Sequence, residues 1–343
     1  MYIWGVCWAK RETHAEQEHV DETDRIRFSC AGNRADGAAG TDSHHAAHVR
    51  WHGRQHPWGA AGPDRRWDFY GTTSNGGANG SGTVFKIIPG GSLTTIYNFC
   101  SQSGCTDGSE PNGLVQAANG DFYGTTGSGG ANNYGTVFKI TSAGTLTTLY
   151  SFCSQYGCTD GRNPESGLVQ AMNGDFYGTT YYGGAGTGDY IGDGTIFKIT
   201  PNGAFTTLYS FCPQYGCPDG AYPEGVLVQA TDGDLYGTTF KGGANEFQAG
   251  AIFKITAGGT FTSVYSFFCS PSGCWDGVNP QAGLIQASNG DFYGTTTSRG
   301  PLEGGTLAAG TVFRMTPSGT LTTLSGFTCK EHVCPNGTIP EGG

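Results

Sequence analysis

The hexapeptide Asp-Phe-Tyr-Gly-Thr-Thr at residues 121–126 decides the fold, because it recurs along the chain. Copies begin at Asp68, Asp121, Asp175, Asp234 and Asp291, the fourth with Leu in place of Phe. Successive copies lie 53, 54, 59 and 57 residues apart. A repeat of this length, made of short β-type runs, is typical of a modular array whose units stack on one another to bury their apolar faces.

The residues around the second copy predict four consecutive strands. A short apolar run at 113–117 ends at Asn119-Gly120, a strong signal for a tight hairpin because both residues tolerate positive φ. The hexapeptide follows as a second strand, rich in aromatic and β-branched residues. Residues 135–141 (Gly-Thr-Val-Phe-Lys-Ile-Thr) and 145–152 predict the third and fourth strands.

Apolar residues occupy both faces of the middle strands, since Val137 and Phe138 are adjacent. A sheet with one wet face would alternate more cleanly, so each sheet is expected to pack between two neighbours. We therefore predict an all-β protein, a β-propeller of four-stranded antiparallel blades. Four complete blades begin at Gly113, Gly167, Gly225 and Gly283, and a partial blade precedes them, so we expect the ring to be truncated.

Residues 1–67 differ in composition from residues 68–343. They hold seven of the eight His, five of the six Trp and eight of the eleven Arg, and no copy of the repeat. Their charges balance, so the net charge of −10 lies in the repeat region. We interpret 1–67 as an out-of-frame or disordered leader, the alternative being a genuine His- and Arg-rich leader, and 68–343 as the propeller domain.

Ten of the twelve cysteines form five Cys-x4-Cys pairs, one after each fourth strand. The pairs are Cys100/Cys105, Cys153/Cys158, Cys212/Cys217, Cys269/Cys274 and Cys329/Cys334. We predict a local disulfide in each pair and hence an oxidising compartment, which means extracellular, cell-surface or periplasmic. Zinc is disfavoured because pairs on separate blades would not converge on one ion.

An Asp-Gly pair follows each of the first four Cys pairs, with Asp at 107, 160, 219 and 276. We predict that each carboxylate accepts backbone N–H bonds in an Asx-type turn. Calcium is the alternative, because carboxylates and exposed carbonyls are oxygen ligands, but one carboxylate per blade is few. We expect no cofactor.

The combination of Gly-Leu-Val-Gln-Ala, Asp-Phe-Tyr-Gly-Thr-Thr, Gly-Thr-Val-Phe-Lys-Ile and Leu-Thr-Thr-Leu-Tyr-Ser-Phe resembles the GloVer (Gloeo_Verruco) tandem-repeat family over residues 68–340. The resemblance implies a propeller-like fold and a secreted or surface-anchored bacterial protein of the choice-of-anchor type. It implies no catalytic residues.

The strand order places the Cys-containing loops and the loops between second and third strands at one end of every blade. Aromatic residues collect there, and we predict that they contact a ligand. The candidates are Tyr134, Tyr156, Tyr181, Tyr182, Tyr190, Tyr215, Phe247 and Trp275. For any one of them, packing against a neighbouring loop is the alternative.

Three functional classes fit the sequence. We favour an extracellular binding or adhesion module for a glycan or a cell-surface protein, since no constellation of nucleophile, base and acid is visible. A carbohydrate-active lyase or hydrolase using two of Asp189, Asp193, Glu246 and Glu303 is the first alternative, and a structural surface spacer is the second. An acidic repeat region disfavours nucleic acid as a partner, and no run is apolar enough to span a membrane.

Overall fold

The computed structural model describes residues 68–88, 91–186, 192–213, 215–245, 247–269, 274, 276–298 and 307–329. It also describes two short strands, β1 (Trp8–Ala9) and β2 (Phe28–Ser29), which pair with each other. The rest of the predicted leader lies outside the described residues. Among the residues that are described, no helix has the length and hydropathy needed to cross a bilayer.

The repeat region forms one three-stranded and four four-stranded antiparallel sheets. The first sheet consists of β3 (Phe69–Thr73), β4 (Thr83–Ile87) and β5 (Leu93–Asn98). The second consists of β6 (Ser109–Gln116), β7 (Phe122–Ser128), β8 (Thr136–Ile140) and β9 (Leu146–Ser151). The third consists of β10 (Val169–Gln170), β11 (Phe176–Thr180), β12 (Thr195–Ile199) and β13 (Phe205–Ser210).

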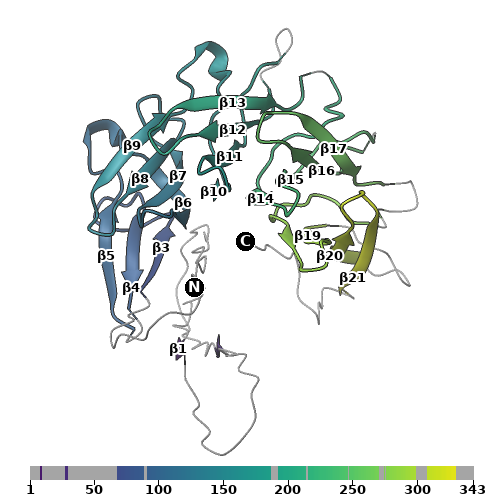
Figure 1. The fold of residues 1–343 in the computed structure, drawn as a ribbon, viewed down its shortest axis with the longest axis horizontal. Helices are drawn as coiled ribbons and strands as arrows, with labels where there is room; N and C mark the ends of the chain where they lie inside the picture. Colours follow the sequence, from purple (N-terminus) through teal and green to yellow (C-terminus); the bar gives the residue numbers. More distant parts are fainter. Residues whose placement is uncertain are drawn as a thin grey trace, which may run out of the picture.

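The last two sheets repeat this order. They consist of β14 (Val228–Gln229), β15 (Leu235–Thr239), β16 (Ala251–Ile255) and β17 (Phe261–Ser266), then β18 (Ile285–Gln286), β19 (Phe292–Thr296), β20 (Leu307–Met315) and β21 (Leu321–Cys329). Strands follow chain order within each sheet, as in a propeller blade. Figure 1 shows β6, β10 and β14 toward the middle of an arc, with β5, β9, β13 and β17 along its outer edge. The predicted fold is confirmed, with four complete blades and one partial blade in an arc that is open.

The inner strands depart most from the prediction. The first begins at Ser109, four residues before the predicted start at Gly113, whereas β10, β14 and β18 each contain two residues. In these three blades pairing resumes only as isolated bridges, such as Arg162 with Tyr182. A proline lies at the same position in all four blades, and in β6 the pairing continues past Pro111 with a register shift between Pro111 and Leu114.

The glycine of the hexapeptide has a packing role. Gly124 pairs with Phe138 on the neighbouring strand, and a Cβ added at Gly124 would lie 2.7 Å from the Phe138 Cζ. The same contact joins Gly71 to Phe85 and Gly178 to Phe197. The buried Phe of each third strand therefore lies across the glycine of the second strand, which requires a residue without a side chain.

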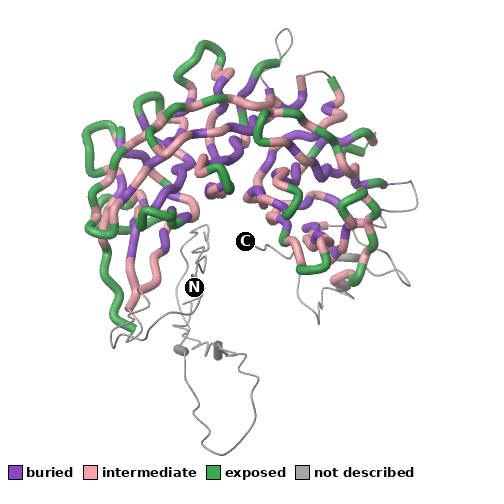
Figure 2. The backbone as a smooth tube through the Cα atoms, in the orientation of Figure 1, coloured by how far each residue is buried: buried purple, intermediate pink, exposed green. Residues whose placement is uncertain are grey.

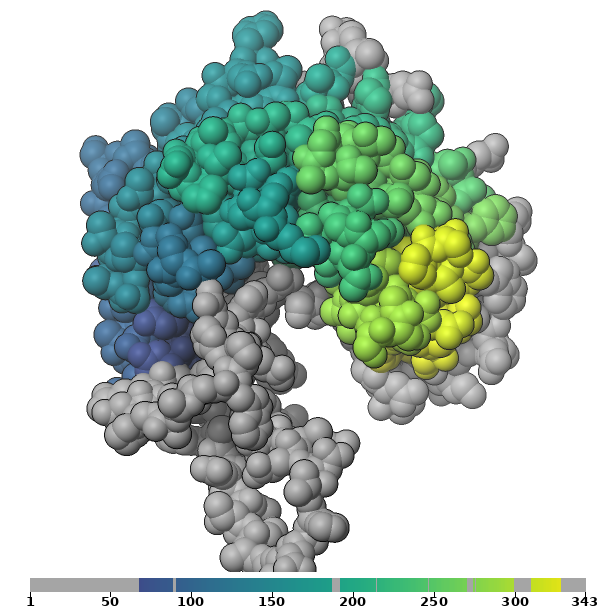
Figure 3. Space-filling view, in the orientation of Figure 1, coloured from purple at the N-terminus to yellow at the C-terminus, as the bar shows by residue number. Residues whose placement is uncertain are grey.

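Neighbouring blades pack through aromatic residues on both faces of the sheets. The Tyr123 ring stacks on Phe176 of the next blade with centroids 4.0 Å apart, and Tyr70 lies 4.3 Å from Phe122 with the two rings tilted by 35°. The four large core clusters each combine residues from two adjacent sheets, which confirms the expectation that sheets pack between neighbours. Figure 2 shows buried positions concentrated along the middle strands, and Figure 3 shows successive blades in contact around the arc.

One backbone hydrogen bond recurs at the blade junctions. The N–H of Asn163 donates to the Tyr134 carbonyl of the preceding blade at 2.8 Å. Glu110, Tyr222 and Asn279 donate in the same way, at 2.8–3.0 Å, and all four donors have φ between 52 and 58°. Asn tolerates this left-handed conformation, whereas for Glu and Tyr it is uncommon and must be held by the surrounding contacts.

Candidate functional site

The two sets of loops predicted to share one end of the blades are in contact. The carbonyl of Cys105 accepts a hydrogen bond from Gly130 N in the following blade at 2.9 Å, and that of Cys158 accepts one from Gly184 N at 2.9 Å. These Cys-containing loops therefore support the second-to-third-strand loop of the next blade. We call this end of the molecule the loop face.

Four of the five predicted disulfides are present in the described residues. They join Cys100 to Cys105, Cys153 to Cys158, Cys212 to Cys217 and Cys269 to Cys274. For the fifth pair, Cys334 and the side chain of Cys329 lie outside the described residues. In the first two loops a single 3-10 turn, η1 (Ser103–Cys105) or η2 (Tyr156–Cys158), ends at the second cysteine.

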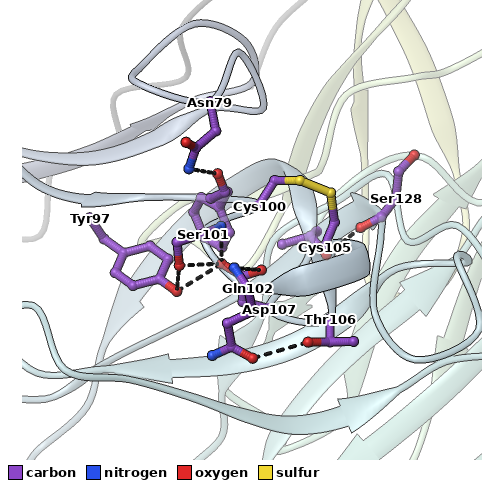
Figure 4. Close-up of a disulfide and its surroundings, with 11 residues drawn as sticks. Asn79, Tyr97, Cys100, Ser101, Gln102, Cys105, Thr106, Asp107 and Ser128 are labelled. Atoms are coloured by element: carbon purple, nitrogen blue, oxygen red, sulfur yellow. Dashed lines mark hydrogen bonds between the residues drawn. A yellow bond between two sulfur atoms is a disulfide. The ribbon is translucent and has the colours of Figure 1, made fainter.

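The buried aspartate of each loop organises its backbone. Asp107 is completely buried, and its Oδ2 accepts hydrogen bonds from Tyr97 Oη at 2.8 Å and from both Ser101 N and Ser101 Oγ at 2.9 Å (Figure 4). Burial, together with the bond to Asp107, raises the pKa of Tyr97 to about 12. These contacts are the structural role that the Asp-Gly spacing predicts.

The same arrangement recurs in the other blades. Asp160 accepts from Tyr150 Oη at 2.6 Å and from Ser154 N at 2.8 Å. Tyr209 donates to Asp219, and Tyr265 donates to Asp276. The sequence identifies these aspartates but not their tyrosine partners, although a Tyr stands ten residues before the Asp in three blades and eleven before it in the fourth.

Three predicted ligand contacts are strongly exposed on the loop face. Tyr156 is 100% exposed, Tyr215 87% and Phe247 55%. Tyr156 and Tyr215 occupy the same position of two Cys-x4-Cys loops, directly before a glycine, whereas Ser103 has that position in the first loop. The loop therefore forms without tyrosine at this position.

A row of aromatic rings crosses the junctions around the third blade. The guanidinium Cζ of Arg162 lies 5.5 Å from the Tyr134 ring centroid and 5.2 Å from that of Tyr182. Tyr182 contacts Tyr181 edge-on at 4.5 Å, and Tyr181 stacks on Tyr222 at 5.0 Å. We call these five residues the Arg162 ladder.

Two of the predicted ligand contacts are partly buried and pack against other residues. Tyr134 is partly buried against the core between the second and third blades. Tyr181 is also partly buried, because it stacks on Tyr222 and hydrogen-bonds to Glu224. Packing therefore accounts for much of the environment of these two rings, while Tyr182 stays 39% exposed. Tyr190 and Trp275 lie outside the described residues.

A group of carboxylates lies beside the ladder. Glu224 accepts hydrogen bonds from Gln281 and Tyr181, and its pKa is raised by burial and by the neighbouring Glu165. Burial also raises the pKa of Asp193, which accepts a hydrogen bond from Tyr222. The sequence interpretation selects Asp193 and misses Glu165 and Glu224.

A signal for the missed pair is present in the sequence. In each blade, the residue after the proline of the Asp-Gly-x-x-Pro segment lies within the inner strand or a few residues before it. The equivalent residues of adjacent blades should therefore be neighbours around the arc. They are occupied by Asn112, Glu165, Glu224 and Gln281. Of the other carboxylates proposed from sequence, Asp189, Glu246 and Glu303 lie outside the described residues.

One group has the composition of a metal site. Asp193 lies with its Oδ2 3.6 Å from Cys217 Sγ, and Cys212 Sγ is close to both. The two sulfur atoms form a disulfide with each other, so they are not thiolate ligands. This group therefore lacks the donor set that a zinc site requires.

The sequence profile of the Gloeobacter/Verrucomicrobia repeat matches residues 64–308 and 193–343. The chain belongs to this repeat family. No curated protein matches the sequence of this repeat protein.

Several solved structures are similar in fold. A luciferin-regenerating enzyme is 10% identical, with a TM-score of 0.42 and coverage of 76% of this chain and 72% of that one. An ulvan lyase is 8% identical, with a TM-score of 0.43 and coverage of 76% and 67%. Dipeptidyl peptidase 4 of Porphyromonas gingivalis is 8% identical, with a TM-score of 0.40 and coverage of 75% and 37%.

Proposed function

We propose that this repeat protein is an exported binding module whose loop face recognises a glycan. The observation that carries the proposal is the complete exposure of Tyr156 at the tip of a disulfide-closed loop. Since Ser103 occupies the same position in a sister loop, the fold does not require an aromatic ring there. Covering such a ring with a binding partner removes apolar surface from water, which is energetically favourable.

The contacts of the loop hold the backbone that carries this ring. Asp160 fixes the backbone on one side of Tyr156, and the Cys153–Cys158 bond closes the loop around it. A ring on a rigid loop loses little conformational entropy when it is covered, and this is how preorganised binding surfaces gain affinity. Pyranose rings present flat C–H faces of about the size of a tyrosine ring, which makes a sugar a suitable partner.

Export is part of the same proposal. Four disulfides are present in the described residues, and structural disulfides persist in oxidising compartments. A cell-surface or extracellular position would bring the loop face to glycans. An adhesin-type contact with a protein is the other partner class that exposed tyrosines would suit.

A glycan-array screen of the oxidised protein tests the proposal, with Tyr156→Ser and Tyr215→Ser as the variants. Each substitution introduces the residue of the sister loop, so folding should be retained. Met172→Ala serves as the control, because Met172 is 77% exposed in a hairpin turn away from the loop face. We expect the tyrosine variants to lose about tenfold or more in affinity, as is typical when an aromatic anchor is removed, and the control to bind normally. Binding that is the same in all three variants would refute the role of the loop face.

One observation favours a second candidate, a carbohydrate-active enzyme. Glu224 has a raised pKa beside Glu165 and is hydrogen-bonded by Tyr181, and a carboxyl group with a raised pKa next to a second carboxyl group is a feature of general acid and base catalysis. Incubation of the protein with polysaccharides, followed by reducing-end and unsaturated-product assays, tests this candidate. Activity in the wild type that is abolished in Glu224→Gln would support it, and no product from any polysaccharide bound on the array would count against it.

A further inference from the structure

Arg162 is a cation with an unusual environment. Two rings flank its guanidinium, and its Nε is buried without a hydrogen-bond partner. None of the ion pairs found in the described part of the chain involves it. Arg314 differs, since it takes the place of the repeat lysine and pairs with Asp291 at 3.8 Å.

The repeat does not need an arginine at this position. Arg162 and Tyr182 form a cross-strand bridge pair, and the same pairing recurs in three other blades. The equivalent pairs are Ser109 with Ser128, Ala221 with Lys241, and Val278 with Ser298. Small or polar side chains therefore satisfy the fold, and the Arg–Tyr combination occurs in one blade of the four.

The geometry favours recognition of a carboxylate. A guanidinium is planar and presents its N–H groups as a fork that matches the two oxygens of a carboxylate. The flanking rings limit the orientations of the fork, so less freedom is lost when it binds. Tyr182, at 39% exposure, places an aromatic ring beside the fork, where the ring of a sugar could stack while its carboxylate pairs with Arg162.

We propose that Arg162 and Tyr182 form a subsite for the carboxylate of a uronic-acid residue, so that the ligand of the loop face is an acidic polysaccharide. This inference rests on the proposed function and names its ligand class. The repeat region carries the whole net charge of −10. A polyanion is therefore repelled by most of the surface, and its capture depends on the local contact with Arg162.

Affinity electrophoresis in gels containing polygalacturonate, or the same polymer fully methyl-esterified, tests the proposal. The variants are Arg162→Ser, which introduces the side chain of Ser109, and Arg162→Lys, which keeps the charge and removes the fork. We expect the wild type to bind polygalacturonate and Arg162→Ser to have an affinity at least about tenfold lower. The affinity of Arg162→Lys should fall between the two. Tyr182→Ser, which introduces the side chain of Ser128, should also weaken binding, and thermal unfolding reports whether each variant is folded.

The outcomes separate this inference from the proposed function. Equal binding of the acidic and esterified polymers, or unchanged binding by folded Arg162→Ser, would overturn the carboxylate subsite. If poly-glutamate binds as tightly as polygalacturonate, the carboxylate would be assigned to a protein partner, and the proposal of a polysaccharide ligand would be overturned. Array binding to neutral glycans alone would refute the subsite and leave the proposed function standing, whereas no glycan binding at all would refute both.

Discussion

Replacing Asp160 by Asn should destabilise the protein far more than a single-atom change suggests. Three donors point at Oδ2 of Asp160, namely Tyr150 Oη at 2.6 Å, Ser154 N at 2.8 Å and Ser154 Oγ at 2.9 Å. Oδ1 accepts only from Gln155 N, at 3.3 Å. An Asn can place its carbonyl oxygen in the Oδ2 position, but the acceptor then has no formal charge, and its NH2 group faces the N–H of Gln155.

The magnitude follows from these contacts. A hydrogen bond to a charged group contributes about 1.5–3 kcal/mol and a neutral one about 0.5–1.5 kcal/mol, so each of three bonds loses about 1 kcal/mol. We therefore expect Asp160→Asn to lower the free energy of unfolding of this blade by about 3 kcal/mol. Tyr150→Phe, which removes one donor, should lower it by about 1–2 kcal/mol.

Asp121→Asn is the matched control. Asp121 pairs with Lys139 at 2.7 Å, and both side chains are more than a fifth exposed, so this ion pair should contribute about 1 kcal/mol or less. Guanidinium unfolding of the oxidised protein, followed by circular dichroism, compares the variants. Hydrogen exchange of the peptide spanning 146–160 measures the local effect, because repeat arrays open blade by blade. An Asp160→Asn loss no larger than that of Asp121→Asn would refute the reasoning.

Three further predictions concern other contacts of the loop face. Replacing Cys153 and Cys158 together by Ser should cost about 2 kcal/mol, since the bond closes a loop with a sequence separation of 5, and reduction of the wild type should lower its unfolding midpoint; an unaffected midpoint would contradict this. Because the pKa of Glu224 is raised, its stabilising contribution is complete below its ordinary pKa of 4.5 and is lost as pH rises through the raised pKa. Glu224→Gln should therefore gain stability relative to the wild type between about pH 4 and 7. A difference in unfolding free energy that does not change with pH would oppose this. Tyr181→Ala should lose about 2 kcal/mol because its ring is stacked and hydrogen-bonded, whereas Tyr156→Ser should change stability by less than about 0.5 kcal/mol, and equal thermal shifts would argue against the assigned burial.

The blade can be predicted from sequence because its signals are local and repeated five times. The hairpin at Asn119-Gly120 and the aromatic strand that follows it each specify their own conformation, and repetition separates them from chance. The short inner strands are less predictable. Pro164 has equivalents in the other blades, yet the strand runs through this position only in β6, so the repeated sequence alone does not set the length of the inner strand.

The loop face can be predicted in outline but not in detail. The position of Tyr156 in its loop indicates exposure, and the structure agrees. The sequence predicts a ligand contact at Tyr181 because its loop is not repeated, yet a second residue outside the repeat pattern, Tyr222, packs against it. Unique residues on two blades can thus pair with each other, and such pairs are invisible when each loop is compared only with its own equivalents.

The backbone bond from Asn163 to Tyr134 has a consequence for how such a protein can change in length. At each of the blade junctions that have this bond, a backbone carbonyl of one blade accepts a hydrogen bond from the N–H of a left-handed residue at the same repeat position in the next blade. The bond forms with different side chains at these positions. A duplicated segment of one period therefore arrives with both of its joints already compatible. Gene duplication and unequal crossing-over can add or remove whole blades while the loops at the tips diverge independently, so ligand preference can evolve on one blade without any change in the scaffold.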